Sequence, residues 1–190
     1  MIERIEETLR RLLSDPSPAV REAASVALDR TGARRSMERF RALLRGGSVE
    51  ERFRVVYSAA EMGGGEGVSL LIEALADGSP EVRGAAVRAL APHTSPPVLK
   101  ALWEMLPREQ GVVLGNLLET LGASGRKELA PHVEKYLVHG NTEVRAKAVG
   151  AFARMTDAAG WEKILALAAD PDETVRAAVA EALGNWTSRP

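Results

Sequence analysis

The chain has 190 residues, a mass of 20.4 kDa and a net charge of −1, with 45% hydrophobic and 27% charged residues. It contains no cysteine, which excludes disulfides, thiolate metal sites and thiol catalysis. Only 3 Trp, 2 Tyr and 3 Phe are present, a shortage that argues against β-sandwiches and barrels and favours helices rich in alanine and leucine.

Short amphipathic segments follow one another along the chain, and each has the spacing of a helix. In residues 20–28, for example, apolar side chains recur at i, i+3, i+4, i+7 and i+8. Ser, Asp, Asn, Gly or Pro separate the segments and favour helix starts. We expect Pro131 to kink or split its helix. The predicted helices are 2–13, 20–32, 36–45, 51–63, 67–76, 82–94, 96–106, 110–122, 126–138, 144–156, 160–169 and 175–186.

Six of these segments align with one another at a nearly constant interval. They begin at residues 20, 51, 82, 110, 144 and 175, so the steps between them are 31, 31, 28, 34 and 31. A repeat of this length, with a second helix before each copy, is typical of stacked helix pairs. The sequence therefore predicts an all-α fold with about twelve helices. We expect one domain, residues 1–190, forming a right-handed α-solenoid of about six helix–turn–helix repeats.

Charged residues recur in the turns of this repeat. Three copies carry an aspartate followed six residues later by an arginine, two carry only the arginine, and the fourth carries neither. In this pattern the chain resembles the HEAT-repeat family, and its short alanine-rich repeats are similar to those of phycobilin lyases. The resemblance implies a structural ladder between repeats rather than a catalytic site. The ladder residues are Asp15, Arg21, Arg52, Asp77, Arg83, Arg145, Asp170 and Arg176.

The sequence contains no recognisable catalytic, cofactor-binding or metal-binding motif. The glycine-rich segment 63–67 follows a predicted helix rather than a strand, and no lysine of a phosphate-binding loop follows it, so we interpret it as a turn. His93, His132 and His139 have no carboxylates at ligand spacing. The His-Glu pairs of the di-iron hydroxylases with HEAT-like repeats are missing as well. We therefore predict no cofactor and no metal.

A basic segment lies between Arg30 and Arg54. It holds eight arginines against three glutamates, a local charge of +5. Such a patch attracts phosphates, so binding of a nucleic-acid backbone is one hypothesis. A mixed, solvated helix face is the alternative that we favour, because the rest of the chain is acidic.

The concave face of a solenoid is its usual binding surface. In HEAT-like arrays the second helix of each pair lines that face, and its outward positions here are mixed in charge. Phe53 and Tyr57 lie four residues apart, either as an exposed interface anchor or with one ring buried. The candidate partner-binding residues are Phe53, Tyr57, Arg88, Asn116 and Arg154.

Our main hypothesis from the sequence is a non-enzymatic scaffold that binds a protein or peptide in this groove. The resemblance implies an alternative role in phycobilin attachment, as a lyase subunit or chaperone. The C-terminal repeat ends at GNWTSRP, where we expect Trp186 to cover the end, or a second copy or further sequence to pack. Charges in the first thirteen residues and the lack of ~18 consecutive apolar residues predict a cytoplasmic protein without a membrane helix.

Overall fold

A computed structural model describes residues 1–186, and the last four residues of the predicted domain 1–190 and of its C-terminal segment lie outside this range. Within residues 1–186 the chain is helical, with no strand. The α-helices are α1 (Ile2–Leu12), α2 (Pro18–Gly46), α3 (Val49–Met62), α4 (Gly64–Ala74), α5 (Pro80–Leu90), α6 (Pro96–Met105), α7 (Gly111–Ala123), α8 (Ala130–Glu134), α9 (Thr142–Met155), α10 (Ala158–Ala166) and α11 (Glu173–Gly184). Short 3₁₀ helices cover η1 (Leu106–Arg108), η2 (Lys127–Leu129), η3 (Lys135–Val138) and η4 (Leu167–Ala169).

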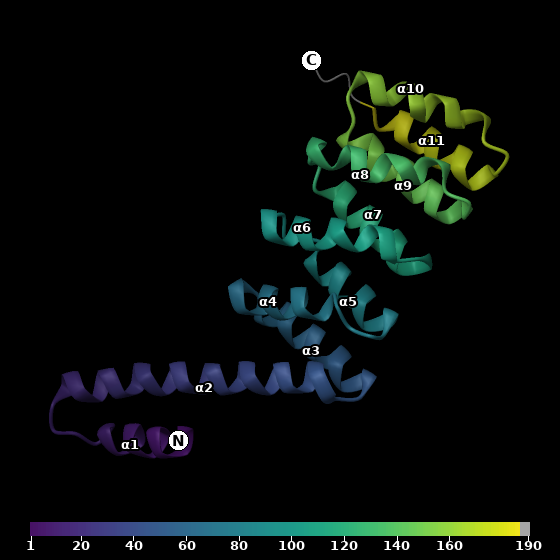
Figure 1. Ribbon diagram of the computed structural model, residues 1–190. Coiled ribbons are helices and arrows are strands. Elements are labelled where there is room, and N and C mark those ends of the chain that lie inside the picture. The colour runs from purple at the N-terminus through teal and green to yellow at the C-terminus, as the bar shows by residue number, and fades with distance from the viewer. Residues whose placement is uncertain (187–190) are drawn as a thin grey trace. The chain divides into compact units, whose positions relative to one another are not determined.

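The chain divides into two compact units, residues 1–55 and 56–190. In the first unit α1 lies along α2, at the purple end of the ribbon (Figure 1). The carboxylate of Glu6 is buried between these helices and forms ion pairs with Arg10 at 3.1 Å and with Arg35 at 3.3 Å. The contact between α1 and α2 is therefore partly ionic, and buried Ala24 and Met37 on α2 provide apolar surface.

The structure corrects the prediction of two helices at 20–32 and 36–45, because α2 runs through both as one helix of 29 residues. The expected turn contains Gly32 but no proline, and the alanine and arginines that follow it are good helix formers. One glycine inside a helix costs only ~1 kcal/mol relative to alanine, which is too little to end the helix by itself. This fusion is why residues 1–186 form eleven α-helices rather than about twelve.

The second unit is a stack of helix pairs. Helices α5, α7, α9 and α11 form one layer in which each contacts the next, and α4, α6 and α8 each contact the following helix of that layer (Figure 1). Its core includes Leu90, Leu121 and Phe152, all at most 1% exposed. A Cβ added at Gly122 would lie 2.6 Å from the Cα of Ala151, so α7 and α9 touch backbone to backbone. Small residues are needed where helices pack this closely.

The helix starts give the repeat a strictly constant length. The residues that precede α2, α5, α7, α9 and α11 are Ser17, Ser79, Gln110, Asn141 and Asp172. Ser48 precedes α3, where its hydroxyl accepts the N–H of Glu51. Each of these positions is 31 residues after the previous one (17, 48, 79, 110, 141, 172). The steps of 28 and 34 in our alignment were therefore wrong, and the fourth copy begins at Val113 instead of Gln110.

Pro131 splits its segment, as predicted. Residues 126–138 form η2, the five-residue α8 with Pro131 in its first turn, and η3, instead of one helix. The proline ring has no N–H and fits the first turn of a helix but not its interior. No helix within the described residues 1–186 combines the length and the apolar character that a membrane span requires.

Candidate functional site

An arginine lies four residues after the capping position in five of the six repeats. In each case its Nη1 donates to one or two carbonyl oxygens of the turn before the same helix, at 2.7 to 3.2 Å. The arginines are Arg21, Arg52, Arg83, Arg145 and Arg176. Because turn carbonyls have no helical partner, these bonds fix the turn to the start of the helix.

A second set of contacts closes four of the six turns, from a residue two positions before the cap. The Oδ1 atoms of Asp15, Asp77 and Asp170 accept the N–H of the capping residue at 2.8 to 2.9 Å. In the fifth repeat His139 does the same with Nδ1, which accepts the N–H of Asn141 at 3.1 Å. The imidazole therefore takes the place of the aspartate in the turn, and its lone pair on Nδ1 leaves the proton on Nε2.

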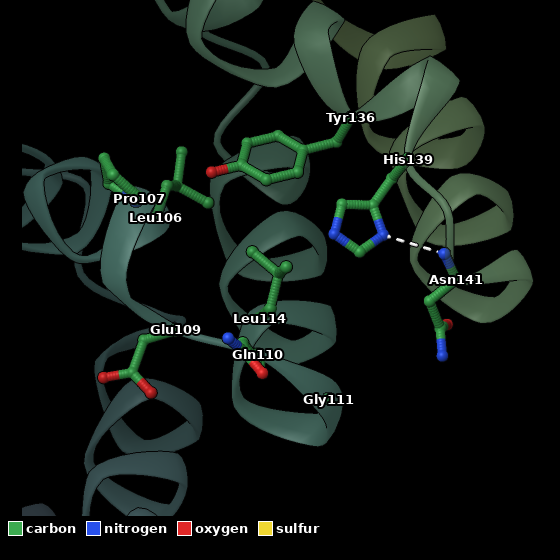
Figure 2. A pocket seen from close by; sticks show the side chains of 9 residues that line it. All are labelled: Leu106, Pro107, Glu109, Gln110, Gly111, Leu114, Tyr136, His139 and Asn141. Atoms are coloured by element: carbon green, nitrogen blue, oxygen red, sulfur yellow. Dashed lines mark hydrogen bonds between the residues drawn. The ribbon is translucent and has the colours of Figure 1, made fainter.

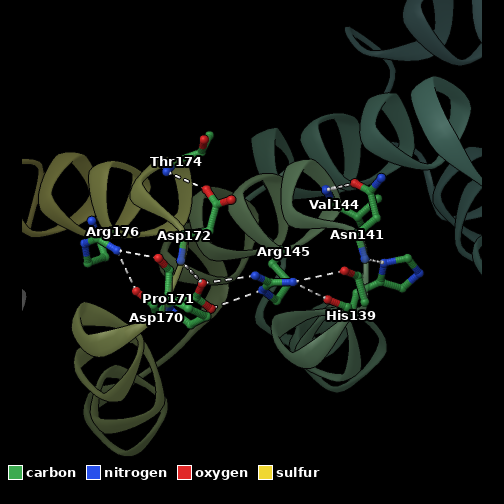
Figure 3. A network of polar contacts seen from close by, with 10 residues as sticks. His139, Asn141, Val144, Arg145, Asp170, Pro171, Asp172, Thr174 and Arg176 are labelled. Atoms are coloured by element: carbon green, nitrogen blue, oxygen red, sulfur yellow. Dashed lines mark hydrogen bonds and ion pairs between the residues drawn. The ribbon is translucent and has the colours of Figure 1, made fainter.

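Arg145 and Asp170 form a rung that joins two repeats (Figure 3). Arg145 Nε lies 3.1 Å from Asp170 Oδ2 and Nη2 lies 3.0 Å from Oδ1, a two-point contact between a guanidinium and a carboxylate. Hydrogen bonds from Arg145, and then from the N–H of Asp172, lower the pKa of Asp170. The hydrogen bond with Asp170 in turn raises the pKa of Arg145. The rung thus holds both groups in their charged forms.

A second rung joins Arg83 to Glu109, which our sequence alignment missed. Nε of Arg83 lies 2.7 Å from Oε1 of Glu109, and Nη2 lies 2.9 Å from Oε2. The hydrogen bonds with Glu109 raise the pKa of Arg83. At the 31-residue repeat the acidic position of this copy is Arg108, one residue earlier. A glutamate side chain is one methylene longer than an aspartate side chain, so Glu109 reaches Arg83 although it lies one residue later. With the repeats aligned at 31 residues, the sequence would have indicated Glu109 as the partner of Arg83.

The fourth repeat has no arginine to build the next rung. Leu114 stands at the arginine position and is 1% exposed, and His139 stands at the acidic position of the following turn. A pocket of about 440 Å³ lies there (Figure 2). Its walls are formed by Leu106, Pro107, Glu109, Gln110, Gly111, Leu114, Tyr136, His139 and Asn141.

The alignment from residues 82 and 110 makes Arg88 and Asn116 equivalent, each as the seventh residue of its copy, and the corrected register changes this. The position of Arg88 corresponds to Tyr57 in the previous repeat and to Glu119 in the next, while Asn116 corresponds to Lys147. Lys147 on α9 and Glu119 on α7 form an ion pair across the two helices. Asn116 on α7 therefore faces Arg88 on α5 in the same relation as Lys147 faces Glu119.

Arg88 and Asn116 meet beside a glycine. A Cβ at Gly84 would lie 3.6 Å from Asn116 Nδ2 and 3.7 Å from Arg88 Nη1. Among the described residues the buried Nδ2 of Asn116 has no hydrogen-bond partner, and the exposed guanidinium of Arg88 has no acidic partner. Both donors thus lie near Gly84, whereas the equivalent residues of the next helix pair, Lys147 and Glu119, form an ion pair.

The other predicted partner-binding residues are spread over two helices. Phe53 and Tyr57 are both on α3, with Phe53 half-buried and Tyr57 57% exposed. Arg154 is exposed near the end of α9. At the C-terminal end, Trp186 makes an edge contact with Trp161 at 6.4 Å between ring centroids and remains 56% exposed.

The arginines between Arg30 and Arg54 are distributed over α2 and α3. On α2 the positions of Arg30, Arg34, Arg41 and Arg45 share one side of the helix at 100° per residue, whereas Arg35 pairs with Glu6 of α1. On α3 Arg54 pairs with Glu50. The basic segment therefore forms an arginine stripe along one side of α2, made of Arg30, Arg34, Arg41 and Arg45.

Two of the three histidines, His132 and His139, make side-chain contacts within the fold. The ring of His132 stacks on Trp103 with centroids 5.2 Å apart, and His139 closes its turn. Within residues 1–186 no three side chains of His, Asp or Glu are placed to hold a metal ion together.

The stacked helix pairs and the repeated rungs define an α-helical repeat solenoid. The chain belongs to the HEAT repeats family, whose pattern matches residues 37–122 and 109–184. This result agrees with the resemblance to HEAT repeats that the aspartates and arginines of the turns indicated.

Solved structures show the same fold. The complex of CpcE and CpcF of phycocyanin lyase from Nostoc sp. PCC7120 is 20% identical, with a TM-score of 0.64 over 81% of this chain and 66% of that one. Computationally designed armadillo repeat proteins for modular peptide recognition are 17% identical, with a TM-score of 0.54 over 98% of this chain and 100% of that one. Comparison with curated proteins found no match.

Proposed function

We propose that this chain is a non-catalytic scaffold that binds a protein or peptide on the concave face lined by α5, α7 and α9. The observation that carries the proposal is the buried Asn116 Nδ2, which has no hydrogen-bond partner among the described residues and lies beside Gly84, as does the exposed guanidinium of Arg88. A buried amide without a partner costs free energy, so an acceptor from outside the chain would be favourable there. The backbone carbonyl or side-chain carboxylate of an extended peptide is such an acceptor.

The surroundings of this pair suit a chain of protein rather than a compact ligand. Gly84 and Gly115 are buried and have no side chains, so the side chains of the neighbouring helix lie close to them. Tyr57 stands one repeat before Arg88 and offers an exposed ring, while the Lys147–Glu119 pair stands one repeat after it. The designed armadillo proteins, similar in fold, recognise peptides.

Selection from a random peptide library with the full chain as bait tests this function. We expect enriched peptides whose affinity falls at least tenfold for Arg88→Ala and for Asn116→Ala. Lys100→Ala on α6, outside this face, is the matched control and should bind normally. Failure to enrich any peptide, or equal binding by all three variants, would contradict the proposal.

A second candidate is a role in bilin attachment, supported by the fold shared with the phycocyanin lyase complex. The test is incubation of the chain with bilin and an apoprotein. A shift in bilin absorbance that requires the chain supports this role, and an unchanged spectrum contradicts it.

A third candidate is binding of a nucleic-acid backbone by the arginine stripe of α2. The single long helix places Arg30, Arg34 and Arg45 on one side. Such binding should weaken steeply with added salt. A mobility shift that is insensitive to salt, or no shift, rules it out.

A further inference from the structure

In the fourth repeat Leu114 occupies the position of the ladder arginine. In the five other repeats a guanidinium fills this place and donates to the carbonyls of the preceding turn. Leu114 is shorter and has no donor, so the equivalent carbonyls of Arg108 and Glu109 receive no such bond from their own repeat. The pocket of about 440 Å³ lies where that guanidinium would have been.

The walls of this pocket offer oxygen acceptors. Tyr136 is only 7% exposed, and its hydroxyl points into the pocket without a hydrogen-bond partner among residues 1–186 (Figure 2). Burial raises the pKa of Tyr136, so the hydroxyl is neutral at pH 7. Glu109 also lines the pocket, with its carboxylate turned away from the rings of Tyr136 and His139 (Figure 2) and accepting two hydrogen bonds from Arg83.

Flat rings form another wall. The rings of Tyr136 and His139 lie 6.0 Å apart, and both line the pocket. Since Nδ1 of His139 accepts the N–H of Asn141, the proton is on Nε2, and the imidazole offers the pocket its ring and an N–H donor but no acceptor (Figure 2). Planar groups stack well on such faces, and a guanidinium is planar while an ammonium is not.

We propose that the pocket beside Leu114 binds a guanidinium group. The group would belong to an arginine side chain of a partner protein and would take the place of the ladder arginine that the fourth repeat lacks. An ammonium would satisfy fewer acceptors and would lose more hydration. This pocket involves none of the residues of the proposed peptide face, so either proposal can fail without the other.

Nuclear magnetic resonance titration of the full chain with N-acetyl-arginine amide tests the proposal. We expect saturable shifts of the Tyr136 and His139 ring signals, with a millimolar dissociation constant and at least tenfold weaker binding of N-acetyl-lysine amide and N-acetyl-glutamate amide. Shifts that do not saturate, or that are equal for all three probes, would overturn it.

Two variants separate this pocket from other sites. Leu114→Arg supplies the chain's own guanidinium and should abolish binding of the arginine probe. Tyr136→Phe removes one acceptor and should weaken binding about tenfold, which decides the matter even if Leu114→Arg does not fold. Arg88→Ala should leave the titration unchanged. Undiminished binding by Tyr136→Phe and by folded Leu114→Arg would refute the assignment.

Discussion

Glu109 accepts two hydrogen bonds from Arg83, at 2.7 and 2.9 Å, although it lies one residue after the position that the repeat assigns to the ladder acid. The longer side chain of glutamate makes up for the shift of one residue along the turn. The ladder is therefore a geometric relation between two turns, and a sequence pattern of aspartate and arginine describes it only in part.

We expect Glu109→Ala to lower the free energy of unfolding by about 2 kcal/mol, because it leaves a largely buried guanidinium with only its turn carbonyls. For a chain of this size the melting temperature should fall by about 4 to 8 °C. Differential scanning calorimetry measures both quantities. Glu128→Ala, an exposed acid in η2, should change stability by less than about 0.5 kcal/mol. Equal effects of the two variants would show that the rung contributes nothing.

The Asp170 rung predicts a dependence of stability on pH. The pKa of Asp170 is lowered in the folded state, chiefly by Arg145, so its charge stabilises the fold above the ordinary aspartate value of about 3.9. This contribution is lost as the pH falls through that value towards the lower folded pKa. Asp170→Asn should therefore be less stable than the wild type at pH 7, and the difference should shrink below about pH 4.

Urea denaturation between pH 7 and pH 2.5 measures that difference. Asp29→Asn, on an exposed position of α2, controls for removal of one negative charge from the chain. A gap between wild type and Asp170→Asn that stays constant with pH would contradict the assigned role of the carboxylate.

Two glycines of neighbouring helices should respond to alanine in opposite ways. At Gly122 the new methyl would lie 2.8 Å from the Cβ of Ala151, so α7 and α9 must separate, at a cost of about 2 kcal/mol. At Gly150 on α9 nothing lies within 4 Å of the new methyl, so the higher helix propensity should stabilise the fold by up to about 1 kcal/mol. Chemical denaturation of the two variants checks the signs, and a stabilising Gly122→Ala would refute the close contact.

Gly32 distinguishes one long helix from two short ones. In continuous α2 the glycine is helical and has open space around it, so Gly32→Ala should raise the free energy of unfolding by about 0.5 to 1 kcal/mol. If a turn interrupted the helix here with the glycine in a left-handed conformation, the same change would destabilise the protein. Gly32→Pro should break the helix and serves as the opposite control.

Periodicity and turn chemistry were sufficient to predict the helices and the family. They failed where a local signal was weak: the single Gly32 was interpreted as a turn, and the fourth copy, without Asp or Arg, was aligned three residues early. That alignment made Asn116 the equivalent of Arg88 and concealed Glu109. A test of equal spacing at 31 residues would have found both.

The amino-acid sequence by itself determined the all-helical repeat, because the interval of apolar residues and the small side chains are properties of each segment alone. Only the tertiary structure decided which groups meet between segments. The Arg83–Glu109 rung, the unsatisfied amide of Asn116 and the pocket beside Leu114 depend on contacts between residues of neighbouring repeats. Such contacts are set by how one helix pair packs on the next, and no local pattern encodes them.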